Sequence, residues 1–225
     1  FFVEVATEDE LKEAVLWAER EGKKTYFLGG GSNVLVNDSG IDGLVIRIAN
    51  KGNEISVSGI ASAAGASLAA AVDLSLKNSL TGLEWAIGIP GTVGGAIRGN
   101  AGAFGHSISE SIERVEYFDM GKKSFLTADR EDCSFRYRTS LFKENEGLII
   151  WKVFLKLEKG YGTDESRNIL SYRADNQPKN PSAGCVFKNL KLEDLSAFNA
   201  DLAIEAEESG VVRGGMVGAG WIIDK

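Results

Sequence analysis

Clusters of glycine set between apolar runs are the feature that most constrains this chain. Glycine supplies 27 of the 225 residues, or about 12%, where ordinary usage is about 7%. Only three prolines accompany the glycines, which argues against a low-complexity linker. Glycine is favoured where the main chain must turn sharply or approach a ligand closely. We therefore expect loops whose backbone, rather than side chains, forms a binding surface.

Composition and charge exclude several classes of function. The chain has 25 Lys and Arg against 32 Asp and Glu, a net charge of −7, which argues against a nucleic-acid partner. No apolar run approaches the roughly 20 residues that span a bilayer, and the first residues lack a signal-peptide pattern. Two cysteines form no disulfide framework. We expect a cytoplasmic monomer with no membrane partner and no metal site.

The first fifty residues predict a β-α-β-β unit. Residues 1–5 are typical of a strand, and Thr7 to Glu10 form a capping box for a helix that Gly22 ends. Three further strands are expected, at 25–28, 34–36 and 44–48.

Residues 51–157 predict a second unit of similar texture. We expect strands at 54–58, 112–118 and 149–157, and a helix of small residues at 67–77. Residues 158–163 resemble a linker, and a third region is then expected to contain a helix at 165–172, a polar turn to Pro181 and a strand at 184–187. The sequence begins and ends inside apolar patterns, so we expect a fragment cut at both ends.

Two glycine loops could hold one ligand between the first two units. Gly29 to Asn33 follows a strand, so several backbone N–H groups could converge on an anion, although a plain tight turn is the alternative. The loop lacks the spacing of a Rossmann or P-loop motif. Gly88 to Ala96, followed by Gly99 to Ala103, would let main chain lie flat against a planar or pyrophosphate-bearing group.

Four segments together resemble one enzyme family. These are GGGSN followed by Val34-Leu35, GIPGTVGGA, CSFRYRTSLFK (Cys133 to Lys143) and PSAGCVFKN (Pro181 to Asn189). They resemble, in order, UDP-N-acetylenolpyruvoylglucosamine reductase, the flavoenzyme often called MurB. The resemblance implies an α+β fold: a PCMH-type FAD-binding domain with lobes at 1–50 and 51–157, then a substrate-binding domain at 163–225. The short run from Lys156 to Leu170 is similar to the family's type II form.

The resemblance also implies a reaction. Members of the family use NADPH to reduce non-covalently bound FAD and then pass hydride to C3 of the enolpyruvyl group of UDP-N-acetylglucosamine enolpyruvate. A proton reaches C2, and the product is UDP-N-acetylmuramate, a peptidoglycan precursor. Hydride addition builds negative charge at C2 and the carboxylate, so the site needs a cation and a proton donor.

Residues that match family positions are implied to bind the cofactor and the substrate. For FAD they are Gly29, Gly30, Gly31, Ser32, Asn33, Val34, Leu35, Gly88, Ile89, Pro90, Gly91, Thr92, Val93, Gly94, Gly95, Asn100, Gly102 and Ala103. For the UDP-sugar they are Tyr137, Arg173, Gln177, Lys188 and Asn189. Phe104 stands where many members have tyrosine, so a phosphate hydrogen bond is expected to be missing there.

Arg138 matches the family's catalytic arginine. A guanidinium can grip a carboxylate in bidentate fashion, although pattern alone does not separate Arg138 from Arg136, which would share its strand face. Alignment with the family's Y-R-x-S motif favours Arg138.

Cys185 stands where most members have a proton-donating serine. A thiol is a stronger acid than a serine hydroxyl yet mostly protonated at neutral pH, so it could deliver the proton. The alternative is a small buried apolar residue, which is how we interpret Cys133. The family's catalytic glutamate has no counterpart here, and Glu205, Glu207 and Glu208 resemble a solvated helix face.

Two other readings of the chain stay open. One is an FAD oxidase of the same fold superfamily, in which a histidine often tethers the flavin, but His106 is expected to be structural or solvent-facing. The other is a non-catalytic nucleotide-binding module.

Overall fold

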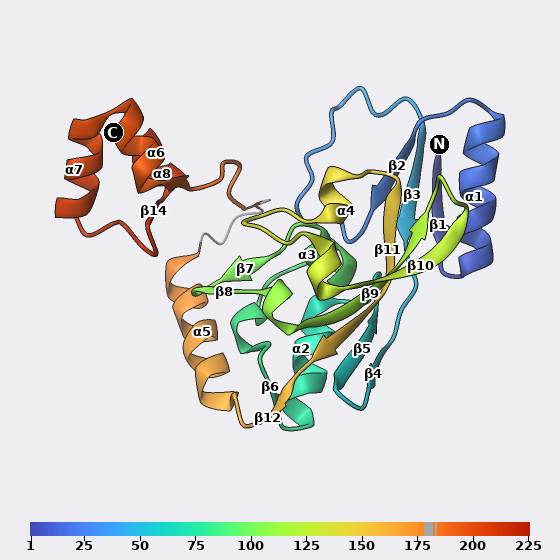
Figure 1. The fold of residues 1–225 in the computed structure, drawn as a ribbon, viewed down its shortest axis with the longest axis horizontal. Coiled ribbons are helices and arrows are strands. Elements are labelled where there is room, and N and C mark those ends of the chain that lie inside the picture. Colours follow the sequence, from blue (N-terminus) through green and yellow to red (C-terminus); the bar gives the residue numbers. More distant parts are fainter. Residues whose placement is uncertain (178–181, 183) are drawn as a thin grey trace. The chain divides into compact units, whose positions relative to one another are not determined.

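The N-terminal lobe, residues 1–50, forms a three-stranded parallel sheet beside one helix. The computed structural model describes residues 1–177, 182 and 184–225 (Figure 1). Its first elements are β1 (Phe2–Val5), α1 (Glu8–Arg20), β2 (Thr25–Leu28) and β3 (Leu44–Ile48), with strand order β1-β3-β2. The predicted capping box is confirmed: Thr7 accepts a hydrogen bond from the Glu10 N–H, and the Glu10 carboxylate accepts from the Thr7 N–H.

The strand predicted at 34–36 is wrong. These residues lie in an irregular loop, where Leu35 is 96% exposed. Gly31 and Gly40 flank the run with φ of +72° and +79°, so the chain turns on both sides of it. An apolar triplet without a neighbouring strand to pair with cannot form a ladder.

The second lobe, residues 51–157, is built on a five-stranded antiparallel sheet with the order β10-β9-β11-β5-β4. Its strands are β4 (Asn53–Ile55), β5 (Gly59–Ala63), β9 (Ile112–Asp119), β10 (Ser124–Asp129) and β11 (Leu148–Lys156). The strand predicted at 54–58 ends early, because Ser56 and Gly59 exchange backbone hydrogen bonds in a hairpin turn.

Helices and short turns complete the second lobe. They are α2 (Leu68–Lys77), η1 (Glu84–Ala86), α3 (Val93–Arg98), η2 (Ile108–Ser111), η3 (Arg130–Cys133) and α4 (Leu141–Glu144), with short strands β6 (Leu80–Thr81), β7 (Gly102–Ala103) and β8 (His106–Ser107). Helix α3 packs against β11 and β5.

Cys133 is a core residue, as predicted. Burial, as the largest cause, and nearby carboxylates, as the second, raise the pKa of its thiol to about 12.

Asn50 joins the two lobes. Its side-chain amide donates to the Trp151 carbonyl over 2.9 Å, and its side-chain oxygen accepts the Gly65 N–H over 2.8 Å. One apolar core runs through both lobes, from Leu11 and Ile46 to Phe118 and Leu155. The lobes therefore form one packed body whose seam is fixed.

The predicted linker is not a free connection. Strand β12 (Glu158–Lys159) pairs with β6, and α5 (Thr163–Asn176), longer than the helix predicted at 165–172, packs against η1. The chain divides by packing into two units, Phe1–Pro181 and Ser182–Lys225, so this boundary lies later than the linker suggested. The polar turn predicted up to Pro181 lies, beyond Gln177, outside the described residues.

The C-terminal unit has its own small core of Leu195, Ala203, Ala206 and Val217. Its elements are β13 (Leu190–Lys191), α6 (Leu192–Phe198), α7 (Ala200–Glu208), β14 (Met216–Val217) and α8 (Ala219–Ile223). The strand predicted at 184–187 is wrong, because Gly184 to Phe187 lie in an exposed irregular segment. None of the helices in the described ranges is both long and apolar enough to cross a membrane.

Candidate functional site

The two glycine loops lie directly against each other. A Cβ atom at Gly29 would lie 2.5 Å from the Thr92 Oγ1, and one at Gly30 would lie 3.4 Å from the Gly91 Cα. The Ser32 hydroxyl donates a hydrogen bond to the Pro90 carbonyl over 3.3 Å. A side chain at position 29 would press against Thr92, whereas a Cβ at position 30 would make an ordinary van der Waals contact, so the close approach itself favours glycine at position 29.

A cavity of about 190 Å³ opens beside this contact, at the seam of the two lobes. One wall is β2 with Gly29, and the other contains Thr92, Gly94 and Gly95 of the second loop together with the start of β11. An engineered cavity of roughly 150 Å³ binds benzene, so this space accommodates a flat ring. The prediction of a ligand held between the two units thus has a matching cavity.

The residues predicted to bind a cofactor separate into several groups. Gly29, Thr92, Gly94 and Gly95 line the cavity, whereas Val93 is buried in the core and Leu35 is open to solvent. Others form the loop contact or flank these residues: Gly30, Gly31, Ser32, Asn33, Val34, Ile89, Pro90 and Gly91. Gly88 lies instead beside the Arg173 side chain. Asn100, Gly102 and Ala103 lie in the segment that contacts the Arg138 guanidinium.

Arg138 occupies a tight turn at the second glycine loop. Arg136 and Thr139 exchange backbone hydrogen bonds of 3.1 Å around it, and Arg138 has a φ of +56°. Its Nη2 donates to the Gly102 carbonyl over 2.6 Å and its Nη1 to the Asn100 carbonyl over 3.3 Å. Within the described part of the chain, Arg138 forms no ion pair with a carboxylate.

The shared strand face predicted for Arg136 and Arg138 is wrong. The two residues sit at different positions of the turn, and the Arg136 guanidinium pairs with the Glu144 carboxylate at the surface. The charge of Arg136 is therefore compensated by a carboxylate, while among the described residues the Arg138 guanidinium contacts carbonyl oxygens and the Tyr137 ring. Geometry thus separates two arginines that the sequence pattern left open.

Left-handed backbone is concentrated around Arg138. Asn100, Phe104 and Ser134 have φ of +42°, +54° and +48°, and they lie in the two segments that meet at the Arg138 guanidinium. The left-handed conformation costs a non-glycine residue roughly 1–2 kcal/mol. Such strained residues cluster at functional sites, where the surrounding structure holds them.

Arg173 on α5 is a second arginine that pairs with no carboxylate in the described ranges. Its Nε and Nη2 are buried and have no hydrogen-bond partner among the described residues, and burial lowers its pKa. The guanidinium lies 5.3 Å from the centre of the Phe104 ring, and Gly88 leaves room for its side chain. Buried polar groups without partners are costly, so this environment suits an anionic ligand.

The other predicted substrate residues have ordinary environments. Tyr137 is 45% exposed beside Arg138, and Gln177 ends α5 with an exposed side chain. In the C-terminal unit, Lys188 is exposed, and the Asn189 side-chain oxygen accepts the Ala219 N–H over 3.3 Å. Cys185 is exposed and follows Gly184, whose φ is +83°.

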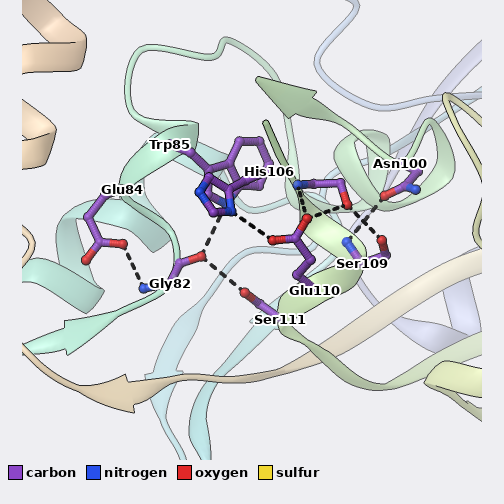
Figure 2. Close-up of polar contacts among 9 residues, drawn as sticks. Gly82, Glu84, Trp85, Asn100, His106, Ser109, Glu110 and Ser111 are labelled. Atoms are coloured by element: carbon purple, nitrogen blue, oxygen red, sulfur yellow. Dashed lines mark hydrogen bonds and ion pairs between the residues drawn. The ribbon is translucent and has the colours of Figure 1, made fainter. Parts of the chain in front are cut away.

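Sequence reasoning missed several cavity residues. Tyr26, Arg98 and Glu146 line the cavity, and only the approach of β2, α3 and β11 brings them together. Tyr26 could have been inferred, since it lies on the strand that leads into the first glycine loop. His106 is half-exposed and pairs with Glu110 over 2.9 Å, which confirms its prediction as a structural or solvent-facing residue (Figure 2).

Comparisons with known proteins agree with this geometry. Residues 1–122 match the family described as FAD binding domain. The chain is 35% identical to the UDP-N-acetylenolpyruvoylglucosamine reductase of Solibacter usitatus over its whole length and 71% of that protein. It is 31% identical to the reductase of Synechococcus sp., again over its whole length and 75% of that protein.

Solved structures show the same relationship. The UDP-N-acetylenolpyruvylglucosamine reductase (MurB) of Thermus caldophilus superimposes with a TM-score of 0.72 and 30% identity, over 96% of this chain and 78% of that one. A cholesterol oxidase from Brevibacterium sterolicum has a TM-score of 0.51 at 17% identity over 70% of this chain and 34% of that one, which shows a shared fold alone.

These findings confirm the α+β, two-lobed PCMH-type fold. The seam also fits FAD, because Gly29, Gly94 and Gly95 line the cavity with backbone that carries no side chains, against which a planar group can lie. The chain therefore belongs to the UDP-N-acetylenolpyruvoylglucosamine reductase family of FAD-binding oxidoreductases.

Proposed function

We propose that this protein reduces the enolpyruvyl group of UDP-N-acetylglucosamine enolpyruvate to UDP-N-acetylmuramate at the expense of NADPH. This reaction would be a step in the synthesis of peptidoglycan precursors in the cytoplasm. Family membership and the FAD-binding domain support the reaction class. The observation that carries the assignment is the Arg138 guanidinium, held by two backbone carbonyls at the second glycine loop rather than by a carboxylate.

Residues of both FAD-binding lobes, 1–50 and 51–157, surround the seam where the cofactor would lie. When bound, FAD carries two electrons from NADPH to the substrate, so that hydride reaches the enolpyruvyl C3. We expect non-covalent binding, since the sole histidine pairs with Glu110. The glycine loops would hold the cofactor through backbone N–H groups.

Arg138 would bind the substrate carboxylate. Hydride addition at C3 leaves negative charge on C2 and this carboxylate, and a fixed guanidinium stabilises that charge through bidentate hydrogen bonds. Because Asn100 and Gly102 hold the guanidinium through neutral oxygens, its positive charge remains available to an anion.

Cys185 would hold the proton for C2. The thiol S–H bond breaks as the new C–H bond forms at C2, and solvent returns a proton to the thiolate afterwards. The exposure of Cys185 supports this role, because a donor must reach the substrate and exchange protons with water. The region from residue 163 onward would contain the substrate-binding domain.

The diphosphate would bind Arg173, whose buried Nε and Nη2 lack partners among the described residues. Tyr137, Gln177 and Lys188 would add contacts to the UDP-sugar. Asn189 would contribute its amide N–H groups, since its oxygen already accepts from Ala219.

The test of this function follows the flavin absorbance of the purified complete protein under anaerobic conditions. NADPH is expected to bleach the yellow flavin, and the enolpyruvyl substrate to restore the colour within the enzyme's turnover time. Oxygen should restore it only slowly. Fast reoxidation by oxygen alone would point to an oxidase, and a colourless protein that takes up no FAD would point to a binding module.

Enlarging Gly95 should weaken FAD binding while the fold is kept. Gly95 lies on α3 at the cavity wall, so the side chain of Gly95→Leu would enter the space that the cofactor needs. We expect the Kd for FAD to rise by about tenfold or more, which is at least ~1.4 kcal/mol. Quenching of flavin fluorescence measures it. Ala69→Leu, at an exposed position of α2, is the matched control and should not change the Kd.

Arg138→Lys should slow substrate reduction, because an ammonium cannot reproduce the planar fork of donors. We expect kcat to fall about 10²–10³-fold, the range for losing one preorganised donor, with the rate of flavin reduction by NADPH unchanged. Stopped-flow kinetics separates the two half-reactions. Arg136→Lys, whose parent residue pairs with Glu144, should behave like the unmodified protein. Normal turnover in Arg138→Lys would remove the proposed role of Arg138.

Two substitutions at Cys185 test the proton donor. Cys185→Ser keeps a proton-bearing side chain and should retain activity within a few-fold. Cys185→Ala should leave bleaching by NADPH intact but slow reoxidation by the substrate about 10²–10⁴-fold. Transient kinetics of both variants, assayed side by side, provides the comparison. An alanine variant as fast as the serine variant would show that the proton comes from elsewhere.

A further inference from the structure

The Asn100 side chain connects two segments that are distant in sequence. Its Nδ2 donates to the Arg136 carbonyl over 2.9 Å, and its Oδ1 accepts the Ser109 N–H over 3.3 Å, as Figure 2 shows for Ser109. The residue is 6% exposed. Both polar ends of the side chain are therefore engaged inside the protein, and little of it can reach a ligand.

The same residue also contacts the Arg138 guanidinium. The backbone carbonyl of Asn100 accepts a hydrogen bond from Nη1, next to the Gly102 carbonyl that accepts from Nη2. Since Arg136 begins the turn that carries Arg138, Asn100 fixes both the backbone that presents this arginine and the charged end of its side chain.

The other end of this connection is firmly anchored. Ser109 lies on η2, and its carbonyl accepts a hydrogen bond from the Arg130 Nε over 2.7 Å. A capping box between Ser107 and Glu110 fixes the start of η2, with the Ser107 N–H donating to the Glu110 carboxylate over 2.8 Å. Asn100 therefore ties the Arg138 turn to a rigid element.

Backbone conformation narrows the choice of residue here. Asn100 has a φ of +42°, which asparagine tolerates better than most side chains. Glycine would accept this φ but has no amide. Aspartate would place an acceptor against the Arg136 carbonyl, where the amide now donates. Asparagine meets both the conformational and the hydrogen-bonding demand.

We propose that Asn100 is a positioning residue that holds Arg138 in place, and not a direct ligand of FAD as the resemblance implied. The effect on turnover rests on the function proposed above, whereas the effect on the placement of Arg138 does not.

The experiment uses Asn100→Gly in the complete, FAD-loaded protein, since glycine keeps the backbone conformation and removes only the amide. The resonance of the Arg138 Nε–H, assigned by its loss in Arg138→Lys, reports the environment of the guanidinium. The Kd for FAD and the two half-reactions are measured in parallel. Ser79→Gly is the control, because it also places glycine at a left-handed position, with a φ of +53°, but at a site just beyond α2.

We expect Asn100→Gly to shift or broaden the Arg138 resonance and to slow substrate reduction at least tenfold. The Kd for FAD and the rate of bleaching by NADPH should stay within twofold of their original values. In an Arg138→Lys background, Asn100→Gly should cause no further loss, because the two residues act as one unit.

Different results separate the possible failures. An unchanged Arg138 resonance, or a loss confined to FAD affinity, would overturn the positioning role. A shifted resonance with normal turnover in both Asn100→Gly and Arg138→Lys would uphold the positioning of Arg138 but overturn its proposed part in the reaction.

Discussion

The close approach of two backbone segments is the constraint on which the site depends. A Cβ atom at Gly29 would come within 2.5 Å of the Thr92 Oγ1, and one at Gly30 would be in van der Waals contact with Gly91. This contact brings the end of β2 onto the start of α3, and the cavity opens beside it. Elsewhere Asn50 and the continuous core hold the two lobes together, so their relative position at the seam is fixed.

The arginines near the second glycine loop differ in how their charges are compensated. Arg136 pairs with Glu144, whereas among the described residues Arg138 has carbonyl oxygens and the Tyr137 ring but no carboxylate, and Arg173 has buried N–H groups without hydrogen-bond partners. A guanidinium that is held without a counter-ion keeps its attraction for a carboxylate or phosphate. Neutral carbonyl groups, rather than a carboxylate, therefore orient the Arg138 guanidinium.

Local patterns predicted much of the fold, because they act within one element. The capping box at Thr7 and the apolar runs that became β9 and β11 are local signals, carried by residues close together in the sequence. The triplet at 34–36 and the segment 184–187 also contain apolar residues, yet no strand in the described part of the chain pairs with either of them. Strand formation requires a partner, and the partner is set by packing that a sequence pattern does not contain.

The family motif led to residues that the structure places at the candidate site, namely Arg138 and the glycines that line the cavity, while their roles stay predictions. The sequence motif does not show which of its residues contact a ligand and which support the fold. Val93 fills the core and Asn100 supports a turn, although both stand among the glycines of the cofactor segment. Such roles depend on contacts between residues 36 or more positions apart, as between Asn100 and Arg136.

The pairing of β12 with β6 attaches the segment that follows the second lobe to the first packed unit. Because this pairing and α5 belong to the first unit, Arg173 folds with the flavin lobes and with Arg138, and Cys185 folds with the C-terminal unit. Evolution or engineering could thus exchange the C-terminal unit for that of a relative, which would replace the proposed proton donor while Arg138 and Arg173 keep their native scaffold.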